Sequence, residues 1–356
     1  MTDNNSGNRK IGILTFHRAQ SYGAVLQCYA LLEVLQKLYP DDRTGVIDFS
    51  PDRFCGDKSK KKKNTSEVLN RFLESHINFI TPSSPTLHGC LKETGLTDII
   101  VGSDQVWNPD ILKDTLRDYY LCGIPDGIRK HSYAASFGVA EWNGDPAATD
   151  VVKTALQQFT GISVREASAV NICGSLGRKD AVNVIDPTLL AGREIFDPIA
   201  EKGTLTGSIA GYFLSSKPEQ IKILKSVARA KQKKNSQILL LNRKAPFLSF
   251  IKASVHTEMA DFLHGIRHAD FVVTDSFHGV CFAILFEKEF AVLPSKRKDR
   301  FTRIAELLEL TGLTDRVIHD ETSDLDRILK TPVDFAKVGE RLALSRSKSL
   351  DFLKKL

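Results

Sequence analysis

The chain alternates short β-rich runs with amphipathic helical segments, and this alternation constrains its fold more than any other feature. It opens with a strand expected at 11–16, a helix at 22–38 and a strand at 45–49. Apolar residues of that helix recur at steps of three and four and share one face: Ala24, Cys28, Leu31, Leu35 and Leu38. This order predicts an α/β fold, with a parallel sheet covered by helices.

The alternation pauses once, around Asp186, Pro187 and Gly203, and then starts again. Before the pause, further strands are expected at 98–102, 131–136, 162–164 and 182–185. After it, we expect strands at 208–214, 237–241, 270–274 and 289–293, and helices at 218–230, 259–267, near Phe277 and beyond Arg300. The 356 residues also exceed the length of one typical domain. We therefore expect two domains, at 9–195 and 204–335, followed by a C-terminal helix at 336–356.

The composition is that of a globular protein. With 42% hydrophobic and 26% charged residues, the chain is neither disordered nor fibrous. Its longest apolar runs, such as 280–286, are shorter than the roughly 18 to 20 residues of a membrane helix, and its first ten residues hold no apolar signal core. Six cysteines form no CxxC pair, which fits a reducing compartment. We expect a cytoplasmic protein.

The stretch 57–85 is interpreted as a basic insertion, helical at 68–79. It begins with a lysine cluster: Lys58, Lys60, Lys61, Lys62 and Lys63. These five lysines account for all but one of the net positive charges, which are +6 at pH 7. Such a cluster is most often a solvated loop, and the alternative is a peripheral contact with an anionic surface such as the membrane face. We expect no nucleic acid among the partners.

The segment 270–280 runs from an apolar strand through a polar turn into a helix. Asp275, Ser276 and His278 therefore fall at the carboxyl end of a strand, where the N–H groups of the helix start attract anions. Ser276 can cap the helix, and His278 can exchange a proton near neutral pH. The alternative, that the polar residues only cap the helix and His278 packs in the core, stays open.

The segment that joins the first strand to its helix, together with the start of that helix, contains His17, Ser21, Tyr22 and Gly23. Ligands of α/β folds bind at this position, and Gly23 lets a backbone approach closely. The loop has neither a GxGxxG fingerprint nor a Walker A sequence, so a dinucleotide or nucleoside triphosphate is not indicated.

Polar residues also follow the strand expected at 98–102: Ser103, Asp104, Gln105 and Asn108. Beside Trp107, they suit the hydroxyl groups and the apolar face of a sugar. An Asx turn followed by a tryptophan in the core is the open alternative.

Cationic residues are expected at two further strand ends. Arg165 follows the strand at 162–164, where its guanidinium suits a carboxylate or a phosphate, although it can also be an exposed neighbour of Glu166. A second basic cluster follows the strand at 289–293 and suits a phosphate-bearing molecule or a solvated face: Lys296, Arg297, Lys298, Arg300 and Arg303.

Metal and triad chemistry are weakly supported. His264 and His268 share one helical face, as in some zinc sites, but no HExxH glutamate and no obvious third ligand accompany them. No Gly-x-Ser-x-Gly sequence is present, and no cysteine stands beside a recognisable base motif. We expect no metal.

Six segments, taken in order, resemble the polysaccharide pyruvyl transferase family. They are FHRAQSYGAVLQCYAL at 16–31, VGSDQVWN at 101–108, SYAASFG at 132–138, ISVREASAV at 162–170, VIDPTLL at 184–190 and TDSFHGVCFAILF at 274–286. The resemblance spans about 11–315. It implies two Rossmann-like domains that face each other, GT-B-like, and transfer of pyruvate from phosphoenolpyruvate onto a sugar of a surface polysaccharide or its lipid-linked precursor as a ketal. No cofactor is implied, because phosphoenolpyruvate is the donor substrate.

The resemblance also implies roles for individual residues. His278 would be the general acid, and Arg165 would hold the anionic end of the donor. Further donor-binding residues would come from the C-terminal domain: Ser276, Gly279, Arg300 and Arg303. Acceptor-binding residues would come from the N-terminal domain: His17, Ser21, Tyr22, Gly23, Ser103, Asp104, Gln105 and Asn108.

Two departures from the family pattern bear on anion binding. Relatives that resemble this chain carry an arginine two residues before the histidine, where this chain has Ser276, and an asparagine where it has Ser21. Arg300 and Arg303 are the candidate substitutes for the arginine.

Two other functions fit the same residues. One is a GT-B-type glycosyltransferase that uses a nucleotide sugar, because a fold does not determine its chemistry. The other is a non-catalytic sugar-binding or anion-binding protein whose lysine cluster contacts a membrane or a polymer.

Overall fold

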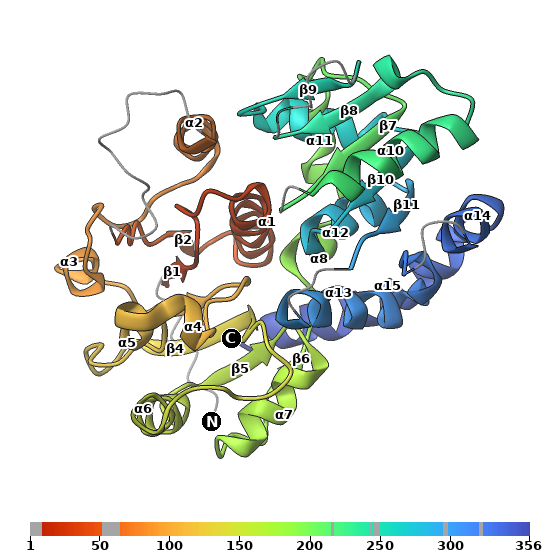
Figure 1. The fold of residues 1–356 in the computed structure, drawn as a ribbon. Helices are drawn as coiled ribbons and strands as arrows, with labels where there is room; N and C mark the ends of the chain where they lie inside the picture. Colours follow the sequence, from red (N-terminus) through yellow and green to blue (C-terminus); the bar gives the residue numbers. More distant parts are fainter. Residues whose placement is uncertain are drawn as a thin grey trace. The chain divides into compact units, whose positions relative to one another are not determined.

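A computed structural model describes residues 9–51, 65–214, 217–242, 244, 250–294, 298–319 and 323–356. Within these residues the chain forms two sheets whose neighbouring strands all pair in parallel (Figure 1). The predicted α/β class is confirmed. The lysine cluster lies outside the described residues.

The first sheet has six strands in the order β2-β1-β3-β4-β5-β6. They are β1 (Lys10–Leu14), β2 (Arg43–Val46), β3 (Asp98–Val101), β4 (Arg129–Ala135), β5 (Gly161–Val164) and β6 (Val182–Asn183). The helices between and after them are α1 (Tyr22–Leu38), α2 (Thr65–His76), α3 (Leu87–Leu91), α4 (Pro109–Leu112), α5 (Leu116–Tyr119), α6 (Pro146–Leu156), α7 (Ala167–Ser175) and α8 (Pro187–Ala191). β1 lies between β2 and β3. The chain therefore adds β2 on one side of β1 and then places β3 on the opposite side of it.

The second sheet has five strands in the order β11-β10-β7-β8-β9. They are β7 (Ile209–Tyr212), β8 (Ile238–Leu241), β9 (Lys252–Ser254), β10 (Phe271–Thr274) and β11 (Glu289–Val292). Its helices are α9 (Asp197–Ala200), α10 (Pro218–Ala230), α11 (Met259–Arg267), α12 (Phe277–Leu285), α13 (Lys298–Thr311) and α14 (Ser323–Lys330). Here too the first strand is internal, because β7 lies between β8 and β10, which is the doubly wound order of a Rossmann-like domain.

Each sheet belongs to one compact unit. Among the described residues, unit 1 comprises 9–51, Phe72–Ala191 and Arg346–Leu356, and unit 2 comprises 65–71 and Gly192–Ser345. The last helix, α15 (Phe335–Leu353), therefore contributes to both units. Its C-terminal part is bonded into unit 1, where Ser349 Oγ accepts from Ile185 N at 3.1 Å and Arg346 Nε donates to Leu189 O at 2.8 Å.

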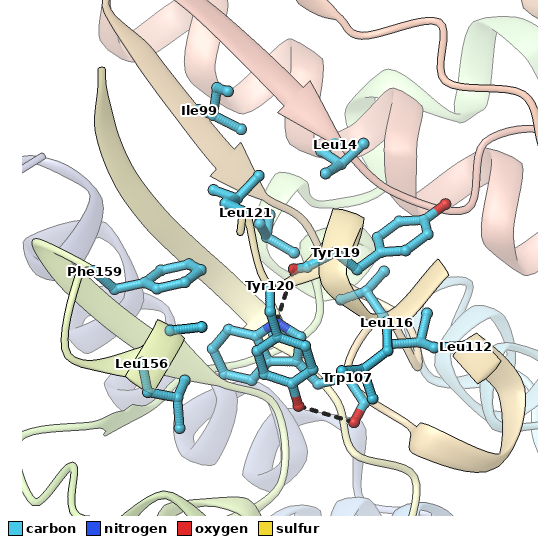
Figure 2. Close-up of a cluster of buried hydrophobic side chains, with 14 of the residues drawn as sticks. Leu14, Ile99, Trp107, Leu112, Leu116, Tyr119, Tyr120, Leu121, Leu156 and Phe159 are labelled. Atoms are coloured by element: carbon cyan, nitrogen blue, oxygen red, sulfur yellow. Dashed lines mark hydrogen bonds between the residues drawn. The ribbon is translucent and has the colours of Figure 1, made fainter. Parts of the chain in front are cut away.

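The core of unit 1 is built around Trp107 (Figure 2). Its side chain is fully buried and stacks on Tyr120, with 5.4 Å between ring centroids. Trp107 Nε1 donates to Tyr119 O at 3.3 Å, and Tyr120 Oη donates to Trp107 O at 3.1 Å. The interpretation of this ring as a sugar platform is therefore wrong, and the alternative, a core tryptophan, is correct.

One predicted element has the wrong end. The helix expected at 68–79 is α2, which stops at His76. Beyond it the chain joins the edge of the first sheet, where Val46 N donates to Asn78 O at 2.8 Å and Ile80 N donates to Val46 O at 2.9 Å. Within the described residues, no helix combines the length and apolar character needed to cross a membrane.

Candidate functional site

Both units have a topological switch point, and most predicted site residues follow the strands that form one. In a doubly wound sheet, the loops after the two central strands diverge and leave a ligand-binding crevice at the carboxyl edge. In unit 1 these strands are β1 and β3, and in unit 2 they are β7 and β10. The residues 17–23 follow β1, 103–108 follow β3 and 275–279 follow β10. Arg165 follows β5, outside the switch point.

In the loop after β1, His17 is fully buried and supports the loop from the interior of the protein. Its Nε2 lies 3.1 Å from Asp48 Oδ1, and its Nδ1 lies 3.1 Å from Thr15 O. Arg18 grips the same carboxylate with two hydrogen bonds of 3.0 and 2.7 Å, while its own side chain is 21% exposed. Burial opposes ionisation of Asp48, but the hydrogen bonds from His17 and Arg18 and the charge of Arg18 outweigh it and lower the Asp48 pKa. Asp48 is a carboxylate at neutral pH.

One departure from the family pattern lies at the start of α1. Ser21 is the N-cap of this helix, and its Oγ accepts from Ala24 N at 3.5 Å. Tyr22 and Gly23 are buried in the first turn. Of the predicted residues in this helix start, Ser21 reaches the surface, and the other two shape the backbone beneath it.

Two buried polar side chains connect the loops of the unit 1 switch point. Gln27 Nε2 donates to Thr15 Oγ1 at 2.9 Å, and Thr15 Oγ1 donates to Ser103 O at 2.8 Å. This chain fixes the exit of β1 against the exit of β3. The sequence analysis missed Gln27, although a glutamine on the apolar face of the predicted helix is a readable signal.

In the loop after β3, Asp104 and Gln105 are partly exposed, whereas Asn108 is buried. Asn108 Nδ2 donates to Gln105 Oε1 at 3.0 Å, and Asn108 Oδ1 accepts from Asp110 N at 3.0 Å and caps α4. Gly138 leaves room for Gln105, because a Cβ at this glycine would lie 2.1 Å from Gln105 Oε1. Asn108 thus orients Gln105.

Arg165 forms a buried ion cluster with three carboxylates. Its Nε donates to Glu166 Oε1 and its NH1 to Asp186 Oδ2, both at 2.9 Å, and its NH2 lies 3.9 Å from Asp104 Oδ1. NH1 also donates to Ser103 Oγ at 3.2 Å, and Ser103 Oγ donates to Asp186 Oδ2 at 2.9 Å. Burial opposes the charge of Arg165, but the three carboxylates outweigh it and raise the Arg165 pKa. The guanidinium of Arg165 is therefore engaged within the protein, with Ser103 and Asp104 beside it.

In unit 2, the turn after β10 is held from two sides. Asp275 Oδ1 accepts from Leu214 N at 2.6 Å, and its Oδ2 accepts from Gln220 Nε2 at 3.2 Å. Asp275 therefore fastens the exit of β10 to the exit of β7 and to α10. These bonds join Asp275 to neighbouring segments, so they differ from the helix cap considered as its alternative role.

Ser276 is the N-cap of α12, with its Oγ accepting from Gly279 N at 3.3 Å. Ser276 N donates to Thr274 Oγ1 at 3.1 Å, and Thr274 Oγ1 donates to Tyr212 O at 2.7 Å. Both serines that depart from the family pattern, at 21 and 276, are thus helix caps.

His278 is the second residue of α12 and is 6% exposed. Its ring lies edge-on to Phe277, with 5.2 Å between centroids. The imidazole stands in the first turn, beside the positive end of the helix dipole. Arg303, in α13, is also buried, whereas the side chain of Arg300 lies outside the part of the chain that the structure describes.

His264 in α11 and His268, the C-cap of this helix, are stacked, with 3.9 Å between their ring centroids. Their Nδ1 atoms contact the backbone carbonyls of Ala200 at 2.9 Å and of His264 at 3.1 Å. Across the described ranges, no group of three or more His, Cys, Asp or Glu side chains has an arrangement that could hold a metal ion.

A comparison with protein-family models decides the family. The model for polysaccharide pyruvyl transferase matches residues 22–297, which covers the strands of both switch points except β1. The chain belongs to the polysaccharide pyruvyl transferase family. This membership confirms the resemblance inferred from the six segments.

Solved structures support the fold. A UDP-GlcNAc 2-epimerase from Neisseria meningitidis bound to UDP-GlcNAc is 10% identical, with a TM-score of 0.58 over 96% of this chain and 100% of that chain. The glycotransferase of kitacinnamycin is 14% identical, with a TM-score of 0.51 over 97% of this chain and 96% of that chain. At these identities the likeness shows the fold alone, which is that of GT-B glycosyltransferases and epimerases. No curated protein matches the chain.

Proposed function

We propose that this protein transfers pyruvate from phosphoenolpyruvate onto a sugar of a surface polysaccharide or its lipid-linked precursor, forming a ketal. The observation that carries the proposal is the position of His278 in a chain of this family: the first turn of α12, at the switch point of unit 2. A proton donor beside a helix N-terminus suits a donor that carries a phosphate and must be protonated at carbon.

In this proposal unit 2 binds the donor. The phosphate is attracted by the N-terminal end of α12, where Ser276 caps the helix and Gly279 keeps α12 close to β10. Arg303, with Arg300, supplies positive charge in place of the arginine absent at position 276. Protonated His278 gives its proton to the methylene carbon of phosphoenolpyruvate, and C2 becomes electrophilic. The balance of this step requires neither a metal nor a redox cofactor.

Unit 1 binds the acceptor in this proposal. Ser21, Asp104 and Gln105 reach the surface at the switch point and would contact the sugar. The buried members of the predicted set support them: His17, Tyr22, Gly23, Ser103 and Asn108. Because the guanidinium of Arg165 is bonded to Glu166, Asp186 and Ser103, we assign it a positioning role toward Ser103 and Asp104 and not a direct grip on the donor.

The test is turnover of phosphoenolpyruvate with a panel of free and lipid-linked glycans, read as phosphate release and as a ketal on the glycan. His278→Ala is expected to lower turnover by about 10²-fold or more, the size typical of general acid catalysis. His268→Ala, which alters an exposed histidine of the same unit, is the matched control and should leave turnover unchanged. A folded and fully active His278→Ala enzyme would show that His278 is not the general acid.

Ligand-induced stabilisation separates this function from a nucleotide-sugar glycosyltransferase. A ligand that binds the native state raises the apparent stability by mass action. Phosphoenolpyruvate, and not uridine diphosphate, should raise the melting temperature. Stabilisation by the nucleotide alone would favour the glycosyltransferase.

A further inference from the structure

Asp104 differs from its neighbours in the unit 1 switch point in its backbone conformation and in its exposure. Its backbone φ is +81°, a region that L-residues rarely occupy. Among the residues that the structure describes, the other positive φ angles outside glycine lie between +49° and +57°. Hydrogen bonds hold this conformation, because Asp104 O accepts from Ser136 N at 3.0 Å and Asp104 Oδ1 accepts from Gln105 N at 2.9 Å. These bonds fix the backbone position from which the Asp104 side chain extends, at the carboxyl edge of the sheet.

The second respect is exposure within the Arg165 cluster. The side chains of Asp186 and Glu166 are 0% and 4% exposed, whereas that of Asp104 is 14% exposed. Both carboxylate oxygens of Asp186 already accept two hydrogen bonds. Its Oδ1 accepts from the N–H and the hydroxyl of Thr188, and its Oδ2 accepts from Ser103 and Arg165. Of the three carboxylates, only Asp104 combines charge with access from outside.

Arg165 pairs directly with the two buried carboxylates of the cluster. Its Nε and NH1 lie 2.9 Å from Glu166 Oε1 and Asp186 Oδ2, whereas its NH2 lies 3.9 Å from Asp104 Oδ1. A proton transferred to Asp104 therefore leaves both direct ion pairs of Arg165 in place.

We infer that Asp104 is the base that removes the hydroxyl proton of the glycan acceptor. The inference rests on the proposed function and adds the missing proton acceptor to it. As the first hydroxyl oxygen bonds to C2 of the donor, its proton goes to Asp104. The C2–O bond to phosphate then breaks, and the phosphate leaves with the electron pair and takes this proton. The second hydroxyl closes the ketal and gives its proton to Asp104, while His278 has supplied the proton of the new methyl group. Asp104 then releases its proton to the solvent and His278 takes one up from it, which restores both groups for the next turnover.

Asp104→Asn tests the inference with little structural change. The asparagine keeps the shape and the acceptor for Gln105 N, and asparagine tolerates positive φ, but it cannot take a proton. We expect turnover to fall by about 10²- to 10⁴-fold, with acceptor affinity changed by less than about threefold. The acidic limb of the pH profile of kcat/KM, which reports the base, should disappear. Asp110→Asn is the matched control, because Asp110 is an exposed aspartate six residues away and bonds to Asn143.

Asp104→Gly separates catalysis from folding. Glycine adopts a φ of +81° without strain, so this variant should be at least as stable as the wild type. It should have lost turnover, and added formate should restore part of it by occupying the space of the missing carboxylate. Turnover of Asp104→Asn within about fivefold of the wild type, or an unchanged acidic limb, would overturn the inference.

The outcome is distinguishable from failure of the proposed function. If the wild type uses another activated donor, such as a nucleotide sugar, and not phosphoenolpyruvate, the pyruvyl transfer is refuted. The Asp104 variants are then measured with that donor, because the base acts on the acceptor hydroxyl whichever carbon it attacks. A wild type that turns over no donor with any glycan refutes both.

Discussion

Replacing Gly279 by alanine tests how tightly α12, and with it His278, is seated on the sheet of unit 2. An added Cβ at this position would lie 2.2 Å from Thr274 Oγ1 and 3.0 Å from Thr274 Cβ, well inside contact distance. Thr274 cannot simply rotate away, because its hydroxyl donates to Tyr212 O and accepts from Ser276 N. Either these bonds break or the start of α12 moves away from β10.

Both routes have a similar cost. Loss of two hydrogen bonds removes about 1 kcal/mol each, and an overpacked contact that displaces a helix costs about 1 to 3 kcal/mol. Alanine regains up to about 1 kcal/mol in helix propensity over glycine. The net expectation is a loss of about 1 to 2 kcal/mol in the stability of unit 2. Gly339→Ala in α15 is the control of opposite sign, because nothing lies within 4 Å of its added Cβ and it should stabilise by about 0.5 to 1 kcal/mol.

The two tryptophans allow the units to be followed separately. Trp107 and Trp142 both belong to unit 1, so tryptophan fluorescence reports on unit 1 while far-UV circular dichroism reports on both units. In urea, Gly279→Ala should shift the part of the circular dichroism transition that fluorescence does not see, and should leave the fluorescence transition in place. Phosphoenolpyruvate binding should weaken as well, because α12 carries the proposed donor site.

A second substitution tests whether the contact with Thr274 causes the loss of stability in Gly279→Ala. In the double variant with Thr274→Ala the hydroxyl is absent, so adding the Gly279 methyl group should cost less than it does in the wild type. Equal costs in the two backgrounds, or a Gly279→Ala protein as stable as the wild type, would show that the close approach of α12 to β10 does not limit this position.

Three further predictions follow from the charged groups. Arg165→Met leaves Glu166 and Asp186 without their cation and should destabilise unit 1, read by fluorescence, by about 3 to 5 kcal/mol; Arg165→Lys should fall in between. If Arg165 only positions its neighbours, Arg165→Lys keeps its affinity for phosphoenolpyruvate in a titration, and a weakened affinity would restore it as a donor ligand. Asp48 has a lowered pKa in the folded protein, so its contribution is present above its ordinary pKa of about 4 and is lost as the pH falls. The destabilisation by Asp48→Asn should therefore shrink between about pH 5 and pH 3, and a constant difference in urea would contradict the assignment. For the lysine cluster, we expect the wild type and a variant with 60–63 changed to serine to co-sediment alike with anionic vesicles at low salt, as a solvated loop would; a salt-sensitive loss in the variant would show a membrane contact worth up to about 1 kcal/mol per lysine.

Much of the fold could be predicted because its elements are long or apolar. The central strands of both sheets and the helix at 22–38 bury one face or both. Buried positions are apolar, so these elements show a regular spacing of apolar residues in the sequence. The strand β9 was missed because it has three residues, its side chains are exposed or half-buried, and nothing selects an apolar alternation at this sheet edge. The helix α6 was also missed, although Asp145 as N-cap and Pro146 at its first position are a readable start signal.

The candidate site was predictable in position but not in detail. Strand-to-helix turns are visible in a sequence, so the loops after β1, β3 and β10 could be named. Which of their residues reach a ligand depends on partners far along the chain: Arg18 meets Asp48 thirty residues later, and Ser103 meets Asp186 eighty-three residues later. These pairings arise only when the sheet assembles. In the structure, Ser103 bonds to Asp186, and Arg165 bonds to Glu166 and Asp186, and none of these bonds is visible in the sequence.

The helix α15 has a consequence for how the protein is made. Unit 2 is inserted between Ala191 and Arg346, and unit 1 is completed by residues 346–356, whose Ser349 and Arg346 bond to the segment after β6. A ribosome therefore releases the whole of unit 2 before the last piece of unit 1 emerges. Unit 2 can reach its native state during synthesis, while unit 1 waits with the exit of β6 uncovered. An expression fragment that stops at residue 195 would carry the same gap permanently, and a version of unit 1 intended to fold alone needs 346–356 reconnected to it through a linker.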